Sequence, residues 1–140
     1  MISKLPNVTT SIFSVMSKMA ADHQALNLSQ GFPNFESDPL LIELVNKAMK
    51  DGFNQYAPMP GDIDLRAAIC EKVKLLHSCV YNIDKEITIT AGATQAIFTV
   101  LAALVKKDDE VLIFTPAYDC YEPTIELFGG KTRAVQLEAP

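Results

Sequence analysis

The chain has 140 residues, of which 49% are apolar and 21% charged, a balance typical of a folded globular protein and not of a disordered one. Its net charge of −5 and its lack of a Lys or Arg cluster disfavour binding to nucleic acid or to an anionic membrane. The N-terminus lacks the apolar segment of a signal peptide and no apolar run is long enough to span a bilayer, so we expect a cytoplasmic protein. The three cysteines fit that compartment by their odd number and have no metal-type spacing, so no metal site is expected.

Apolar spacing and capping residues predict three helices in the first part of the chain. The first is expected over residues 11–22, with Ser11 as its N-cap. The second has Asp38 as its N-cap and begins at Pro39, which suits the first helical position. It ends before Gly52, where a left-handed residue often terminates a helix. A loop rich in proline and aromatic residues follows, and the third helix is expected over residues 62–78, with Asp62 as a capping residue.

Strands and helices are expected to alternate in the rest of the chain. The strands are predicted over residues 86–90, 110–114 and 131–137, and the helices over residues 94–106 and 119–128. Such alternation predicts an α/β fold with a mostly parallel sheet and flanking helices. Three strands with two intervening helices make a thin version of this fold, so we expect the front part of a larger enzyme, incomplete as it stands.

The segment over residues 87–97 is the most informative one. It combines a β-branched strand, a turn of small residues at Gly92 and Ala93, and the start of an apolar helix. The first amides of a helix carry partial positive charge and favour a bound phosphate, and no bulky side chain blocks an approach here. A turn of this kind is common, so it gains specificity only from the other motifs of the chain.

Four separated motifs resemble those of the class I aminotransferases, which are fold type I enzymes that use pyridoxal 5′-phosphate (PLP). They are Asn-Leu-Ser-Gln-Gly-Phe-Pro at 27–33, Asn-Gln-Tyr-Ala-Pro at 54–58, Ile-Thr-Ala-Gly-Ala-Thr at 89–94 and Pro-Ala-Tyr-Asp-Cys-Tyr-Glu-Pro at 116–123. Four motifs in the right order are much more specific than any single one. The kynurenine and methionine aminotransferases are the most similar members.

The resemblance implies a PLP site. Gly92, Ala93 and Thr94 match the turn whose backbone amides hold the PLP phosphate, and Tyr118 matches the aromatic residue that stacks on the pyridine ring. Tyr56 matches a tyrosine that reaches the phosphate of the neighbouring subunit, which implies a homodimer.

The resemblance also implies a substrate pocket and a division of the chain. Gly31 matches the glycine that lies against the substrate carboxylate, and Phe13 and Tyr121 match side chains near the substrate. Residues 1–35 correspond to an N-terminal arm and small-domain segment, and residues 36–140 to the first part of the PLP-binding large domain.

Several catalytic groups of the family match nothing in this chain. The lysine that holds PLP as a Schiff base stands in a later Ser-x-x-Lys motif, and the Asp under the pyridine nitrogen and the carboxylate-binding Arg also come later. No lysine here has that context, and Arg66 and Arg133 match neither role. We therefore predict that residues 1–140 alone are neither catalytic nor well folded.

The expected function of the full-length enzyme is transfer of an amino group between an amino acid, aromatic or sulfur-containing, and a 2-oxo acid. A PLP-dependent carbon–sulfur lyase on the same fold is the alternative, although the motifs at 54–58 and 116–123 favour the aminotransferase. A non-catalytic remnant or a nucleotide-binding α/β domain is a third possibility. The latter fits poorly, because its phosphate turn needs three spaced glycines and this one has only Gly92.

Overall fold

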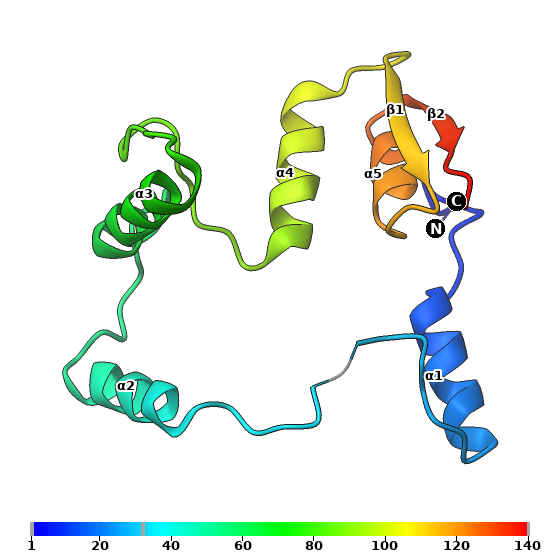
Figure 1. Cartoon of the computed structure of the whole chain (residues 1–140). Coiled ribbons are helices and arrows are strands. Elements are labelled where there is room, and N and C mark those ends of the chain that lie inside the picture. Colours follow the sequence, from blue (N-terminus) through cyan, green and yellow to red (C-terminus); the bar gives the residue numbers. More distant parts are fainter. Residues whose placement is uncertain (1, 32, 140) are drawn as a thin grey trace. The chain divides into compact units, whose positions relative to one another are not determined.

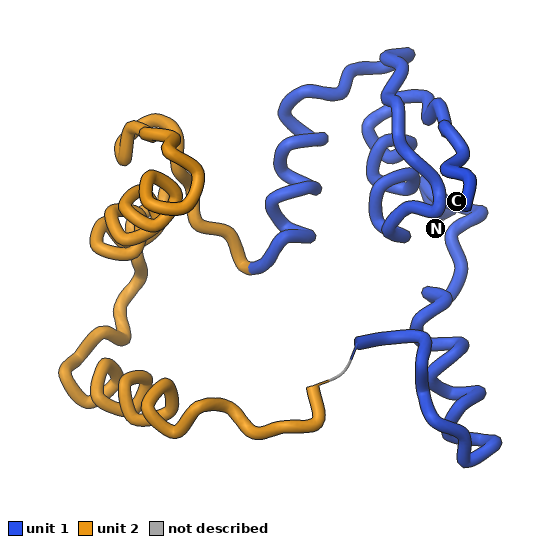
Figure 2. The backbone as a smooth tube through the Cα atoms, viewed as in Figure 1, with its two compact units in different colours: residues 1–32, 92–140 blue, residues 33–91 orange. Residues whose placement is uncertain are grey.

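The computed structural model describes residues 2–31 and 33–139 (Figure 1). Its elements in chain order are α1 (Ile12–Asp22), α2 (Pro39–Lys50), α3 (Ile63–His77), α4 (Ala93–Leu104), β1 (Glu110–Thr115), α5 (Tyr121–Leu127) and β2 (Lys131–Gln136). They fall into two compact units, one formed by residues 1–32 with 92–140 and the other by residues 33–91 (Figure 2).

Side-chain caps begin the first three helices, as the sequence predicted. Ser11 Oγ accepts a hydrogen bond from Phe13 N at 3.3 Å, at the start of α1. Asp38 and Asp62 cap α2 and α3 in the same way. Each cap satisfies an amide that has no acceptor within its own helix, which fixes the residue at which the helix begins.

The first unit contains a parallel β–α–β arrangement. Strands β1 and β2 pair in parallel, from Glu110 opposite Lys131 to Thr115 opposite Gln136, and α5 connects them. Helix α5 packs on β2 and also on α4, where the rings of Phe98 and Phe128 meet edge to face at 5.3 Å. Ile125 of α5 is 1% exposed and forms the centre of this packing.

The second unit contains α2 and α3, and a buried arginine ties its parts together. Arg66 of α3 donates from Nε to Gly61 O at 3.2 Å and from Nη1 to Ile83 O at 2.6 Å. The Ile89 amide donates to Pro60 O at 2.9 Å. These bonds join the start of α3 to the segment that follows it.

The predicted strand over residues 86–90 is wrong. These residues form a turn and an irregular segment between α3 and α4, and the structure places no strand there (Figure 1). A β-strand is defined by its pairing with a neighbouring strand, which a local run of β-branched residues does not supply. The two strands that do form, β1 and β2, pair with each other.

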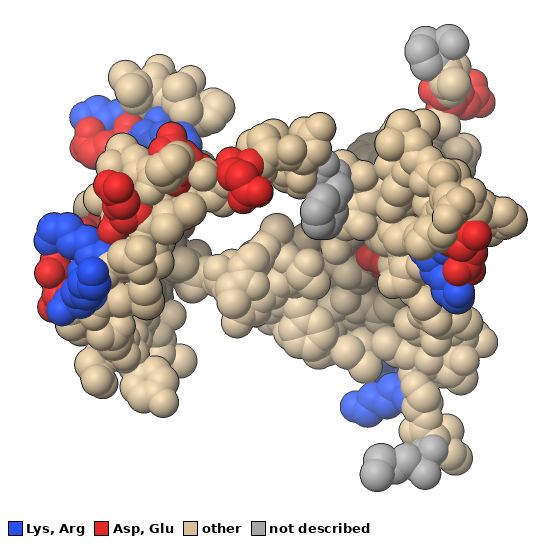
Figure 3. All heavy atoms as spheres, turned by 90° about the horizontal axis from the view of Figure 1, so that it is seen from below, with Lys and Arg blue, Asp and Glu red and all other residues tan. Residues whose placement is uncertain are grey.

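Much apolar surface is open in this structure. Several large side chains on α2 are about half exposed, among them Leu41 at 57%, Leu44 at 54% and Met49 at 49%. An apolar hollow of about 310 Å³ lies among α4, β1 and α5. Charged side chains are interspersed in sign on the face drawn in Figure 3, where Lys and Arg form no single patch.

Candidate functional site

The start of α4 is exposed and shaped by a glycine. Gly92 precedes the helix with φ 89° and ψ 166°, a conformation that is essentially restricted to glycine. A Cβ added at Gly92 would meet no atom within 4 Å, and residues 92–94 are exposed. No acidic residue lies in the first turn of α4, so the partial positive charge of its amides is not offset by a neighbouring carboxylate there.

A loop that carries Tyr118 lies at the same end of the unit. Figure 1 shows that α4 begins at the end of the unit where β1 finishes. Residues 116–120 follow the carboxyl end of β1, after a cis peptide bond between Thr115 and Pro116. In α/β folds with parallel strands, ligands bind at the carboxyl ends of the strands, so this end is where a site is expected.

Three residues that the sequence singled out meet in this loop. The ring of Tyr118 lies 6.2 Å from that of Phe13 and 5.9 Å from that of Tyr121, centroid to centroid. The first pair is tilted by 43° and the second is edge to face, arrangements that aromatic rings favour. Tyr118 is 45% exposed, whereas Phe13 and Tyr121 are partly buried, so one aromatic surface is left accessible.

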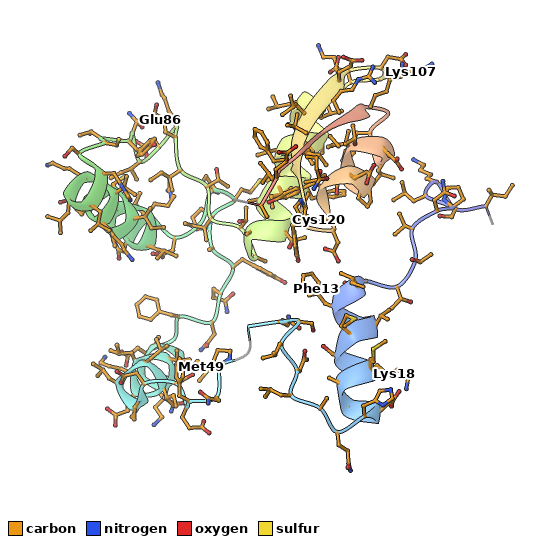
Figure 4. All side chains as sticks on the ribbon, turned by 45° about the vertical axis from the view of Figure 1, so that its right-hand side comes forward. Phe13, Lys18, Met49, Glu86, Lys107 and Cys120 are labelled. Carbon is orange, nitrogen blue, oxygen red and sulfur yellow. The ribbon has the colours of Figure 1, made fainter. Side chains whose placement is uncertain are left out.

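Hydrogen bonds hold the loop at Tyr118 and at the two residues after it. Ser11 Oγ donates to Asp119 Oδ2 at 2.7 Å and so joins the start of α1 to the loop. The Tyr121 amide donates to Tyr118 O at 3.2 Å, and Thr124 Oγ1 donates to Cys120 O at 2.6 Å. Figure 4 shows Phe13 at the start of α1 and Cys120 beside α5. Burial and then the negative charge of Asp119 raise the pKa of the Cys120 thiol, which keeps it neutral.

The remaining predicted residues, Gly31 and Tyr56, are both exposed. Gly31 is exposed, with open space where a Cβ would stand. Phe32, which belongs to the same motif, lies outside the described residues. Tyr56 belongs to the second unit, in the loop after α2, and its side chain is fully exposed.

The model of one protein family, the class I and II aminotransferases, matches residues 23–140. The chain belongs to this family. It is 46% identical over 138 residues to a methionine aminotransferase of Escherichia coli K12, covering 99% of this chain and 36% of the relative. It is 32% identical to human kynurenine–oxoglutarate transaminase 3, covering 97% of this chain and 30% of that protein.

Solved aminotransferases share the fold. The E. coli methionine aminotransferase superposes with a TM-score of 0.93 over 99% of this chain and 36% of its own. The N-succinyldiaminopimelate aminotransferase of Mycobacterium tuberculosis, 34% identical, superposes with a TM-score of 0.90 over all of this chain and 36% of its own. The expected α/β fold of the fold type I aminotransferases is therefore confirmed, and this aminotransferase chain spans about a third of the length of these relatives.

Sequence reasoning missed one contact of the site. Ser11 was recognised as a helix cap, but nothing in the sequence indicated that its hydroxyl also binds Asp119, which is 108 residues away.

Within residues 2–31 and 33–139, no helix is long and apolar enough to cross a membrane. The same residues contain no group of three or more His, Cys, Asp or Glu side chains that could hold a metal ion.

Proposed function

We propose that the protein containing this chain is a PLP-dependent aminotransferase, which moves an amino group between an amino acid and a 2-oxo acid. The chain belongs to the aminotransferase family. The observation that carries the proposal is that the exposed start of α4 and the accessible ring of Tyr118 lie together at the carboxyl end of β1. One element suits an anion and the other suits a flat heteroaromatic ring.

The residues around Gly92 suit the phosphate of PLP. The dianionic phosphate would accept hydrogen bonds from the amides that open α4, and bonds to a charged acceptor are stronger than neutral ones. The absence of a Cβ at Gly92 leaves room for the phosphate oxygens, and no acidic side chain in the first turn would repel them. Gly92, Ala93 and Thr94 would therefore hold this end of the cofactor.

Tyr118 suits the ring of the cofactor. Its own ring is partly exposed, and its position is fixed by aromatic neighbours on two sides. The bound cofactor would supply the electron sink for the transfer, and the protein would supply orientation and electrostatics. Tyr118 would contribute the orientation, because a stacked ring cannot tilt freely.

Amino acids with aromatic or sulfur-containing side chains are the proposed substrates. Phe13 and Tyr121 offer apolar and π surface beside Tyr118, and Gly31 would lie against the substrate carboxylate. Relatives named for methionine and for kynurenine support this substrate class. A pocket of this kind separates substrates that differ by one methylene by only about 1–3 kcal/mol, so several amino donors are expected.

We propose a homodimer in which Tyr56 reaches the cofactor phosphate of the neighbouring subunit. The full exposure of Tyr56 on a loop leaves its hydroxyl available for such a contact. Residues 1–35 would serve as the arm and small-domain segment, and residues 36–140 as the first part of the large domain. The free cysteines suit a cytoplasmic location.

The experiment compares two glycine variants in the protein expressed from the complete reading frame. Gly92 and Gly52 both have positive φ, of 89° and 94°, and a Cβ at either would meet open space. Gly92→Ala and Gly52→Ala therefore both place a Cβ at positive φ without a steric clash, but only the first lies at the proposed phosphate site. Titration with PLP, followed by its absorbance, is expected to give at least a roughly tenfold weaker affinity for Gly92→Ala and little change for Gly52→Ala.

Transamination is then assayed with methionine or kynurenine as donor and 2-oxoglutarate as acceptor. If the unaltered protein neither bound PLP nor transaminated, the proposed function would be wrong. Equal PLP affinity in Gly92→Ala and the unaltered protein would refute the assignment of the phosphate to α4.

A further inference from the structure

We propose that the hydrogen bond between Ser11 and Asp119 sets the position of Phe13 against Tyr118, which makes Ser11 and Asp119 positioning residues of the substrate pocket. The inference rests on the proposed function, because that function gives Phe13 and Tyr118 their place beside substrate and cofactor. It adds two residues for which neither the motifs nor the comparisons supply a role.

The Ser11 hydroxyl joins two elements that are distant in the sequence. It accepts a hydrogen bond from Phe13 N at 3.3 Å and donates one to Asp119 Oδ2 at 2.7 Å. A hydroxyl has one donor and two acceptor sites, so it can make both bonds at once. The same oxygen therefore sets the start of α1 and attaches that start to the loop.

The two aromatic residues are direct neighbours of this hydrogen bond. Phe13 follows Ser11 by two residues and Tyr118 precedes Asp119 by one. The hydrogen bond thus lies within two residues of both rings, whose centroids are 6.2 Å apart. Displacement of Ser11 from Asp119 would carry Phe13 away from Tyr118.

Helix α1 is held at its start by few specific interactions. Among the described residues, α1 packs closely along none of the other helices or strands of its unit. Asp119 takes part in none of the ion pairs found among the described residues, so its negative charge is directed to the Ser11 hydroxyl. A hydrogen bond to a charged acceptor is stronger than a neutral one, which suits its role in attaching α1 to the loop.

Variants at Ser11 separate the helix cap from the bond to Asp119. Ser11→Asn and Ser11→Asp both introduce good N-cap residues of nearly equal size. The Asn amide can still donate to Asp119, whereas the Asp carboxylate cannot donate and repels it. Asp119→Ala and Asp119→Asn form the second pair, since an Asn oxygen still accepts from the Ser11 hydroxyl.

The first readout is hydrogen–deuterium exchange in peptides covering residues 11–19, in the protein expressed from the complete reading frame. We expect exchange there to rise by about tenfold in Ser11→Asp and Asp119→Ala, and to change little in Ser11→Asn and Asp119→Asn. Asp22→Asn is the control, because it breaks the exposed Lys18–Asp22 ion pair of 2.8 Å on the same helix without touching the loop.

The second readout is steady-state transamination. We expect KM for the amino acid to rise about three- to tenfold in Ser11→Asp and Asp119→Ala, with PLP affinity nearly unchanged and rescue in the two Asn variants. Unchanged exchange in Ser11→Asp and Asp119→Ala would show that the hydrogen bond does not hold α1 to the loop, and it would overturn the inference. Faster exchange with an unchanged KM would also overturn it, because α1 would then be held without consequence for substrate.

Failure of the proposed function gives a different result. If the unaltered protein lacked transaminase activity, the substrate role of Ser11 and Asp119 would fall together with the proposed function. The exchange data would still establish whether the two residues hold α1 to the loop.

Discussion

The substitution Gly61→Ala tests the packing between the start of α3 and the segment that leads to Gly92. Gly61 has φ 99°, and a Cβ there would lie 2.4 Å from Ile89 Cγ1 and 2.5 Å from Ile89 Cβ. The strained backbone costs about 1–3 kcal/mol and the overlap with Ile89 costs about another 1–3 kcal/mol. We therefore expect the free energy of unfolding to fall by about 2–6 kcal/mol.

The matched control is Gly52→Ala, since Gly52 has a similar φ of 94° but open space around its Cβ position. This variant should lose only the strain term, about 1–3 kcal/mol. Urea unfolding of the protein expressed from the complete reading frame, with midpoints compared at constant slope, measures both changes.

A double-mutant cycle isolates the contact with Ile89. In an Ile89→Gly background both clashing carbons are gone, so Gly61→Ala should cost about 1–3 kcal/mol less than it does alone. The reasoning is refuted if Gly61→Ala and Gly52→Ala lower stability equally, or if the cycle shows no coupling between positions 61 and 89.

Three further predictions concern the same protein. Tyr118→Ala should weaken PLP binding about two- to tenfold by absorbance titration, and an unchanged affinity would count against stacking. Tyr56→Phe should lower activity at the neighbouring subunit's site. A mixed dimer of a Tyr56→Phe and a Gly92→Ala subunit then keeps one undamaged site, so its activity should exceed the mean of the two parent dimers, and an activity equal to that mean would refute the shared site. Hydrogen bonding and charge from Arg133 hold the pKa of Glu110 below its ordinary 4.5. The Glu110–Arg133 pair therefore contributes its whole stabilising free energy above about pH 4.5, and this contribution is lost as pH falls through the lower pKa of the folded state. In urea unfolding, Glu110→Gln should make the free energy of unfolding depend less on pH in this acid range.

The sequence predicted best those features that neighbouring residues determine. The starts of α1, α2 and α3 follow from Ser11, Asp38 and Asp62, because a cap acts within the first turn of its own helix. Parallel pairing of β1 with β2 was expected from the alternation of strand and helix patterns. The strand over residues 86–90 failed because its existence depends on a partner from elsewhere in the fold.

The sequence predicted individual residues of the candidate site but not how they are arranged in space. Phe13, Tyr118 and Tyr121 were selected by resemblance, and the structure places the ring of Tyr118 6.2 Å from that of Phe13 and 5.9 Å from that of Tyr121. The Ser11–Asp119 bond could not be foreseen, since a serine that caps a helix and an aspartate in a loop carry no signal of their pairing. Distances of this kind follow from tertiary packing, which a single sequence does not encode in any local pattern.

The β1–α5–β2 arrangement has a consequence for biosynthesis. Its three elements follow one another within residues 110–136, so their contacts close short loops and need no distant part of the chain. Although these loops are short, a parallel strand pair forms slowly and two strands alone are only marginally stable, so the apolar hollow among α4, β1 and α5 stays open to solvent during synthesis. The nascent chain would then display an apolar surface beside strands that are not yet paired, a combination that favours aggregation and binding by chaperones.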